Sequence, residues 1–118
     1  MVTKNKKYFE ENQYQEKLKV YLGGHPVPTV ESINATRAVL ENIGRLTSRD
    51  LVFVLISGGG SALFTNPMPG VTLDEIQEMT QILLRCGADI QEINTLRKHL
   101  DLVKGGRLAR SLQPAQVH

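Results

Sequence analysis

The sequence lacks tryptophan and any apolar run long enough to cross a membrane, and it has a single cysteine. One cysteine, Cys86, cannot form an internal disulfide, and its place late in a predicted helix leads us to expect a buried thiol in a reducing compartment. The charged N-terminus has no apolar stretch behind it, unlike a secretory signal. We therefore expect a cytoplasmic protein without a membrane partner.

Net charge is also scarce, at +2, which is too little to favour nucleic acid or a membrane surface as a partner. The charge is unevenly distributed, however, because residues 94–110 contain five bases and one acid. A local cationic patch on a nearly neutral chain suits a small anionic ligand. With 118 residues, 41% of them hydrophobic, the chain has room for one globular domain.

The strongest structural signal is the apolar run Leu51–Ile56 (LVFVLI), which shows no alternation. A strand that is apolar on both faces needs cover on both faces, as in the parallel sheets of α/β proteins. Shorter strands are predicted over residues 19–22 and 115–117. One two-sided strand with one or two short companions cannot close a sheet. We predict part of an α/β domain, a Rossmann-like layered fold with a mostly parallel sheet that is incomplete in this chain.

The remaining pattern predicts helices. Thr29 is a plausible N-cap for a helix that runs to Ile43, with Val30, Ile33, Arg37 and Leu40 along one face. A capping box, Thr72 to Glu75, starts a second helix that Gly87 ends. A third helix is expected from residue 89 or 90 to Gly105, and one further turn over residues 107–112. Residues 1–17 are polar and form either a loose segment or a surface strand with a linker.

The first candidate site is the run Ser57, Gly58, Gly59, Gly60 and Ser61, placed after the buried strand. Glycines let main-chain N–H groups approach a ligand closely, and the carboxyl end of such a strand is where ligands sit in open α/β sheets. A tight strand-to-helix turn without a ligand is the open alternative. The run matches neither the phosphate loop nor the dinucleotide fingerprint.

The second candidate site is the polar face of the third helix, with Asn94, Arg97, Lys98 and Lys104, followed by Gly105 and Gly106. Arginine grips a carboxylate or phosphate with two hydrogen bonds, and lysine supplies a compact positive charge. The alternative is a solvated helix face. Histidine is sparse, and a lone loop histidine such as His25 is more often structural than catalytic. No spacing of His, Cys, Asp and Glu indicates a structural zinc site.

These segments resemble a known family. The motif GHPVP, the strand and glycine run LVFVLISGGGSALF and the stretch PMPGVTLDEIQEMTQILLRCGADIQEINTLRKHLDLVKGGRLA follow one another in this order. Together they closely resemble the glycerate kinases whose second domain is called MOFRL. The resemblance covers about Lys19 to Val117. Thr29 and Val30 depart from the acidic pair that often follows GHPVP, and Asp101 replaces the serine usual after RKHL, which adds a negative charge beside Arg97.

The resemblance implies transfer of a phosphoryl group from ATP, with Mg²⁺, to a hydroxyl of D-glycerate, giving 2-phosphoglycerate or 3-phosphoglycerate. It implies that Ser57 and Gly58 to Ser61 line an anion site and that Asn94 binds substrate beside the catalytic pair Arg97 and Lys98. Lys104, Gly105 and Gly106 would lie at the edge of the cleft. The metal ligands are not assigned within this chain.

The resemblance also implies an incomplete enzyme. Residues 1–18 would be a polar N-terminal segment and residues 19–118 part of the N-terminal domain, without the C-terminal MOFRL domain. Such a piece would be inactive alone. Two alternatives stay open, namely a hydroxypyruvate reductase, a name often attached to this family, and a non-catalytic interaction domain. Whether the chain forms a homo-oligomer is also open.

Overall fold

The computed structural model describes residues 1–5 and 17–118. They form two compact units, and each is described by itself. Unit 1 combines residues up to Gly44 with Ser57–Thr65, and unit 2 combines Arg45–Ile56 with Asn66–His118. Most of the predicted polar segment, residues 6–16, lies outside the described residues. Within those that are described, no helix is both long and apolar enough to cross a membrane.

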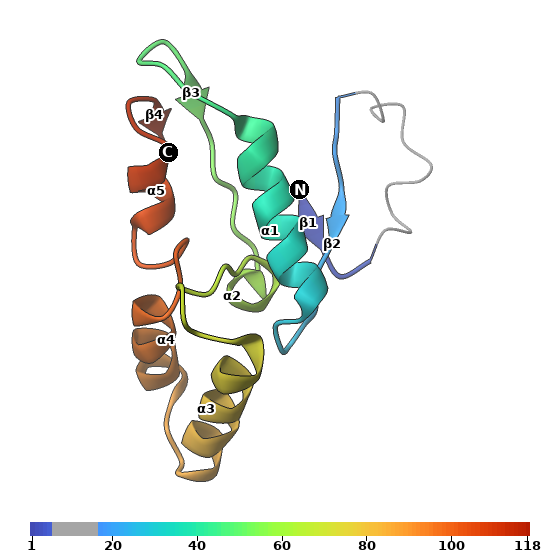
Figure 1. Ribbon diagram of the computed structural model, residues 1–118, viewed down its shortest axis with the longest axis vertical. Coiled ribbons are helices and arrows are strands. Elements are labelled where there is room, and N and C mark those ends of the chain that lie inside the picture. The colour runs from blue at the N-terminus through green and yellow to red at the C-terminus, as the bar shows by residue number, and fades with distance from the viewer. Residues whose placement is uncertain (6–16) are drawn as a thin grey trace. The chain divides into compact units, whose positions relative to one another are not determined.

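Unit 1 contains a short parallel sheet and two helices (Figure 1). Strand β1 (Val2–Thr3) pairs with β2 (Tyr21–Leu22), so the strand predicted over residues 19–22 is present and the N-terminal strand is its partner. Helix α1 (Val30–Ile43) contacts both strands, and the short helix α2 (Gly60–Leu63) belongs to the same unit. The mostly parallel character predicted from the sequence holds here.

Helix α1 begins after Thr29 and ends at Gly44, as predicted. Gly44 has φ +65°, a conformation that residues with a Cβ rarely adopt. The buried face differs from the predicted one, because Val30 is 58% exposed and Arg37 is also exposed. The buried face instead carries small side chains, namely Ser32, Ala35 and Thr36. Small side chains allow the neighbouring backbone to approach the helix closely.

The centre of unit 1 is polar, and hydroxyl groups connect its parts. Ser32 and Thr36 are fully buried, and Thr65 is 2% exposed. The Oγ1 of Thr36 donates to the Ser32 carbonyl at 2.8 Å and accepts from the Thr65 N–H at 2.9 Å. Buried polar groups are tolerated only when they are paired, so these contacts fix the distance between α1 and the segment that follows α2.

Unit 2 contains the second parallel pair and three helices (Figure 1). Strand β3 (Leu51–Val52) pairs with β4 (Gln116–Val117), which confirms the predicted terminal strand as its partner. Helices α3 (Leu73–Arg85) and α4 (Ile90–His99) pack against each other, and α5 (Arg107–Ser111) confirms the further turn. The α/β class predicted from the sequence is therefore confirmed.

The predicted six-residue strand is only partly formed. Beyond β3, the Val54 N–H donates to the His118 carbonyl at 2.7 Å, and the following residues have no place in a ladder. Leu55 is 93% exposed and Ile56 is 80% exposed. The run thus has the apolar composition of a strand that is buried on both faces. Its last residues are nevertheless exposed, because the described residues do not cover them.

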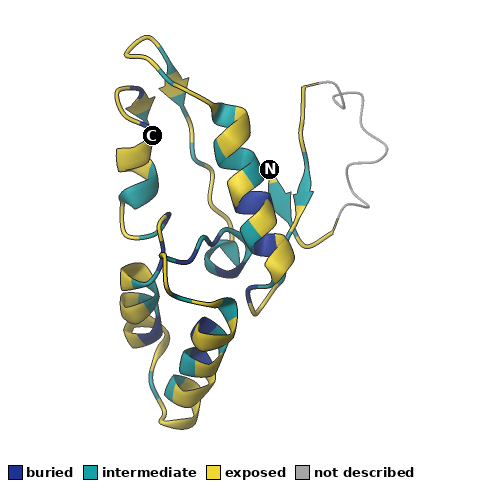
Figure 2. Cartoon of the chain, in the orientation of Figure 1, coloured by how far each residue is buried: buried dark blue, intermediate teal, exposed yellow. Residues whose placement is uncertain are grey.

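Helix α3 has the predicted capping box. The Glu75 N–H donates to the Thr72 Oγ1 at 3.2 Å, and the Thr72 N–H donates to the Glu75 carboxylate at 2.7 Å. The hydrogen bonds that the Glu75 carboxylate accepts from the Thr72 N–H and from the Thr72 hydroxyl lower the pKa of Glu75. Ile76 and Thr80 are the buried residues of the helix, and Figure 2 shows that much of its remaining surface is exposed. Cys86 is exposed, so the expected buried thiol was wrong.

Helix α4 ends at His99, before the predicted end at Gly105. The Asp101 carboxylate accepts from the Val103 N–H at 2.9 Å and from the Asn66 N–H at 3.3 Å. The backbone of Asp101 also forms an isolated antiparallel β-bridge with that of Pro67. A side chain that bonds nearby backbone N–H groups competes with helix formation, so the helix is broken here. Lys104 therefore does not lie on the helix face that carries Arg97.

We expect the isosteric substitution Thr36→Val to destabilise unit 1. It removes the acceptor of the Thr65 N–H and the donor to the Ser32 carbonyl, a loss of about 1–3 kcal/mol in free energy of unfolding. Urea denaturation measures the loss. The matched control is Thr95→Val, whose hydroxyl donates to the Gln91 carbonyl on an exposed surface and whose loss should stay within about 0.5 kcal/mol. Equal effects of the two substitutions would contradict the role of Thr36.

Candidate functional site

The glycine run forms an exposed turn that leads into α2. Gly59 is the N-cap of α2 and has φ +85°, which favours glycine. The Gly60 N–H donates to the Ser57 carbonyl at 3.3 Å, whereas the N–H groups of Gly58 and Gly59 have no acceptor among the described residues. Gly58 has room for a side chain, since nothing lies within 4 Å of the position that a Cβ would take. The turn therefore leaves two main-chain donors for another partner.

His25 lies against this turn, which sequence reasoning did not foresee. A Cβ placed on Gly59 would lie 2.4 Å from the His25 Cδ2 and 2.7 Å from its Nε2. The imidazole thus occupies the space beside the Gly59 backbone, while His25 itself remains exposed. The sequence contained one signal for this contact, namely a histidine between glycine and proline in the GHPVP motif. Its pairing with a glycine far along the chain was not visible.

The turn that carries His25 is fixed to the start of α1. The N–H groups of Gly24 and Thr29 both donate to the buried Ser32 Oγ, at 2.8 and 3.2 Å. Gly24 leaves no room for a side chain, because a Cβ there would lie 2.3 Å from the Thr29 Cγ2. The same helix holds the segment after α2 through Thr36. Helix α1 is therefore the frame that brings His25 and Gly59 into contact.

The predicted face of α4 is present in unit 2 for Asn94, Arg97 and Lys98. The Arg97 Nη2 donates to the Oγ1 of Thr80 on α3 at 3.3 Å. Burial lowers the pKa of Arg97. The Arg97 Nε and the Asn94 Oδ1 are buried and have no hydrogen-bond partner among the described residues. Buried polar atoms of this kind are rare and call for a partner of complementary chemistry.

Lys104 forms an ion pair. Its Nζ lies 2.7 Å from the Asp101 Oδ2, and the side chains are 13% and 3% exposed. Burial lowers the pKa of Lys104, whereas the hydrogen bond and charge of Asp101 act in the opposite direction. The Asp101 carboxylate therefore pairs with Lys104 and accepts hydrogen bonds from backbone N–H groups. The ammonium of Lys104 is held in this ion pair.

Gly105 and Gly106 follow with φ +59° and +83°, and Gly106 is the N-cap of α5. A Cβ on Gly105 would lie 3.4 Å from the Lys98 Cβ, so the glycine pair passes beside Lys98. The guanidinium of Arg107 donates to the Lys98 carbonyl. Unit 2 thus gathers Asn94, Arg97 and Lys98 on α4 with the glycine pair close to Lys98. Residues 57–61 belong to unit 1, so their convergence with this group stays a prediction.

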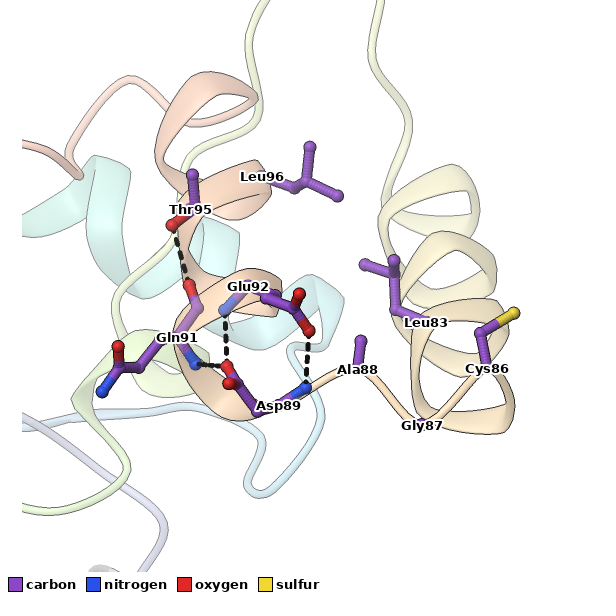
Figure 3. A pocket seen from close by; sticks show the side chains of 9 residues that line it. All are labelled: Leu83, Cys86, Gly87, Ala88, Asp89, Gln91, Glu92, Thr95 and Leu96. Carbon is purple, nitrogen blue, oxygen red and sulfur yellow. Dashed lines mark hydrogen bonds between the residues drawn. The ribbon is translucent and has the colours of Figure 1, made fainter.

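A surface pocket of about 820 Å³ lies at the junction of α3 and α4 and has no predicted site residue in its lining. Figure 3 shows that the carboxylates of Asp89 and Glu92 are turned back onto backbone N–H groups at the start of α4. These acids cap the helix, so the pocket offers no free charged group from that pair. Within residues 1–5 and 17–118 no group of three metal-ligating side chains occurs.

Comparisons with known proteins give a consistent result. The family model described as "Domain of unknown function (DUF4147)" matches residues 1–118. The D-glycerate 2-kinase of Thermotoga maritima is 54% identical over 98 residues, which are 83% of this chain and 24% of that protein. The glycerate 2-kinase of Pyrococcus horikoshii is 46% identical over 98 residues, which are 83% of this chain and 22% of that protein.

A solved structure gives the same picture. The crystal structure of glycerate kinase from Thermotoga maritima matches with a TM-score of 0.86 and 49% identity, over 98% of this chain and 27% of that one. Given 24% and 22% coverage of the two sequence relatives, the chain spans about a quarter of the length of the proteins it matches.

We expect Gly59→Ala to destabilise the chain in two ways, and removal of the His25 ring should reverse one of them. The positive φ costs about 1–2 kcal/mol in any background, and the clash with the imidazole adds to it. In the double variant with His25→Ala only the first cost should remain. Thermal unfolding of the single and double variants measures the difference. Gly58→Ala, in open space, is the control. Additive effects of the two substitutions would contradict the contact.

We also expect Asp101→Asn to lower the free energy of unfolding by about 2 kcal/mol, because it leaves the largely buried Lys104 ammonium without a counter-charge. The double variant Asp101→Asn with Lys104→Met should lose less than the single one, since no unpaired charge remains. Chemical denaturation of the three proteins tests this order. If the single and double variants were equally stable, the ion pair would have no part in holding this segment.

Proposed function

This chain belongs to the family described as DUF4147. From its similarity to glycerate 2-kinases we propose that it is part of an enzyme that transfers a phosphoryl group from ATP to a hydroxyl of D-glycerate. The matches to glycerate 2-kinases confirm the resemblance drawn from the motifs. Because the chain spans about a quarter of those proteins, 24% and 22%, we propose that it supplies one side of the active site. Residues 19–118 would be part of the N-terminal domain, with a MOFRL domain supplying the opposite side.

The observation that carries this proposal is the pair of orphaned polar atoms on α4. The Arg97 Nε and the Asn94 Oδ1 are a buried donor and a buried acceptor without partners among the described residues. A hydroxy acid such as glycerate offers both an acceptor carboxylate and donor hydroxyls. The Thr80 contact already fixes one edge of the guanidinium, so its orientation is set before a ligand arrives.

In this proposal Arg97 and Lys98 are the catalytic residues. Phosphoryl transfer depends on positioning and on neutralising the charge that spreads over the transferred group. Lys98 is exposed and lies next to the glycine pair, so its ammonium is free to approach the transferred phosphoryl group. Arg97 is held in place by its hydrogen bond to Thr80 of α3. Asn94 would orient the substrate.

The glycine run would hold phosphate oxygens of ATP. The free N–H groups of Gly58 and Gly59 support this role, and Ser57, Gly60 and Ser61 complete the turn around them. Lys104 would act at the edge of the cleft with Gly105 and Gly106. Its Nζ is paired with Asp101, so it supports the edge of the site with a largely neutralised charge.

ATP-dependent transfer implies Mg²⁺, which would neutralise the phosphate oxygens when bound. The part of the chain that the structure describes holds no cluster of three possible ligands. Mg²⁺ is usually held by one or two carboxylates together with substrate phosphates, so its ligands are not assigned here and no step of this proposal uses the ion.

The test is a chimera in which the 98 matched residues of the Thermotoga maritima enzyme are replaced by those of this chain. We expect D-glycerate-dependent formation of ADP by the chimera and none by the chain alone. Arg97→Met in the chimera should lower kcat/KM by about 100-fold or more, because it removes a group that binds developing charge. The control, Arg110→Met, changes an exposed arginine of α5 and should leave kcat/KM unchanged.

Two outcomes would contradict the proposal. A folded chimera that oxidises NADH with hydroxypyruvate and forms no ADP would assign a reductase instead. A folded chimera whose ADP formation is equally insensitive to both arginine substitutions would remove α4 from the catalytic site.

A further inference from the structure

The dipole of helix α2 is too small to attract an anion to the glycine turn. Helix α2 has only four residues, so few peptide units add to its dipole. Any attraction must come from individual N–H donors and from the side chains that touch the turn. The N–H groups of Gly58 and Gly59 provide two donors. Two neutral donors that compete with water form only a weak site for an anion, so a further group beside them would be needed for binding.

The side chain that touches the turn is His25. Its Nε2 and Cδ2 lie 2.7 and 2.4 Å from the position of a Cβ on Gly59, so the edge of the ring that carries Nε2 faces the Gly59 backbone. His25 is exposed, and the ring is therefore accessible to a ligand that reaches the turn. A histidine ring nitrogen donates a hydrogen bond in the appropriate tautomer or in the cationic form.

The position of the ring is set by the frame of unit 1. Two N–H groups of the turn that carries His25 donate to the buried Ser32 Oγ, and Thr65, which follows the glycine turn and α2, donates to Thr36 one turn later on the same helix. A rigid helix thus holds both partners of the contact. Preorganised donors bind an anion with less loss of freedom than mobile ones.

We propose that His25 is a ligand-contacting residue of the glycine turn, whose Nε2 donates a hydrogen bond to a phosphoryl oxygen held by the N–H groups of Gly58 and Gly59. This inference rests on the proposed function, because it assigns a third donor to the phosphate site of that enzyme. The ligand class is a phosphate monoester or anhydride. Gly59 is glycine in part because the imidazole needs the space that a side chain would fill.

The test is a titration of the chain with inorganic phosphate at constant ionic strength, followed by NMR. The wild-type chain reports directly, since the Nε2 of His25 and the amides of Gly58 and Gly59 should shift with one common Kd. His25→Leu keeps a side chain of similar bulk over Gly59 but removes the donor, and we expect about tenfold weaker binding. His25→Gln restores a donor and should bind within about threefold of the wild type.

The matched control is His99→Gln, which changes a histidine of α4 whose Nδ1 contacts the Thr95 carbonyl in unit 2, and its Kd should equal that of the wild type. If the glycine amides shift while the His25 ring does not and His25→Leu binds as the wild type does, the inference is overturned and the phosphate site of the proposed function survives. If neither the amides nor the ring respond to phosphate, the site at this turn fails together with the inference. Because the ring is observed in the wild type, a variant that fails to fold does not decide the question.

Discussion

The hydroxyl groups buried along one face of α1 are the constraint on which unit 1 depends. The Ser32 hydroxyl accepts hydrogen bonds from two N–H groups of the turn that carries His25. The Thr36 hydroxyl accepts one from the N–H of Thr65 beyond α2. Burial without these hydrogen bonds would be costly, so the two loops are held at fixed positions on one helix. A polar centre made of small side chains tolerates less displacement of its parts than an apolar one, because each hydrogen bond requires a particular direction. The glycine turn and the imidazole meet because the same helix orients both.

Unit 2 uses a carboxylate for the same purpose. Asp101 ends α4 by bonding the Val103 N–H, joins the segment at Asn66 and pairs with Lys104. The negative charge that Asp101 adds to the sequence beside Arg97 is thus paired with Lys104 inside the unit. Helix α4 also carries the cationic pair Arg97 and Lys98, and the Arg97 Nε is buried without a hydrogen-bond partner among the described residues. In the proposed function, both units would present hydrogen-bond donors to a negatively charged ligand, and buried polar side chains hold those donors in place.

The elements that could be predicted from the sequence are those fixed by local chemistry. The capping box from Thr72 to Glu75 and the glycine after Cys86 define α3, and the apolar run at Leu51 identified the strand and its class of sheet. The early end of α4 could not be predicted, because periodicity continued to Val103 while the break depends on Asp101 reaching Asn66 in space. The contact between His25 and Gly59 is equally non-local. The site residues on α4 and in the glycine run came from motifs, and the histidine was missed because one residue in a loop carries no pattern.

The central claim is that the glycine turn of unit 1 and the cationic face of α4 serve one reaction, the former on the nucleotide and the latter on the acceptor. A crystal structure of the Thermotoga maritima chimera with a non-hydrolysable ATP analogue and D-glycerate tests it most directly. The terminal phosphate should lie within hydrogen-bond distance of the Gly58 and Gly59 N–H groups, and the glycerate carboxylate should be bound by Arg97. Ligands that are both bound in the crystal, with neither the glycine turn nor Arg97 in contact with them, would contradict the claim.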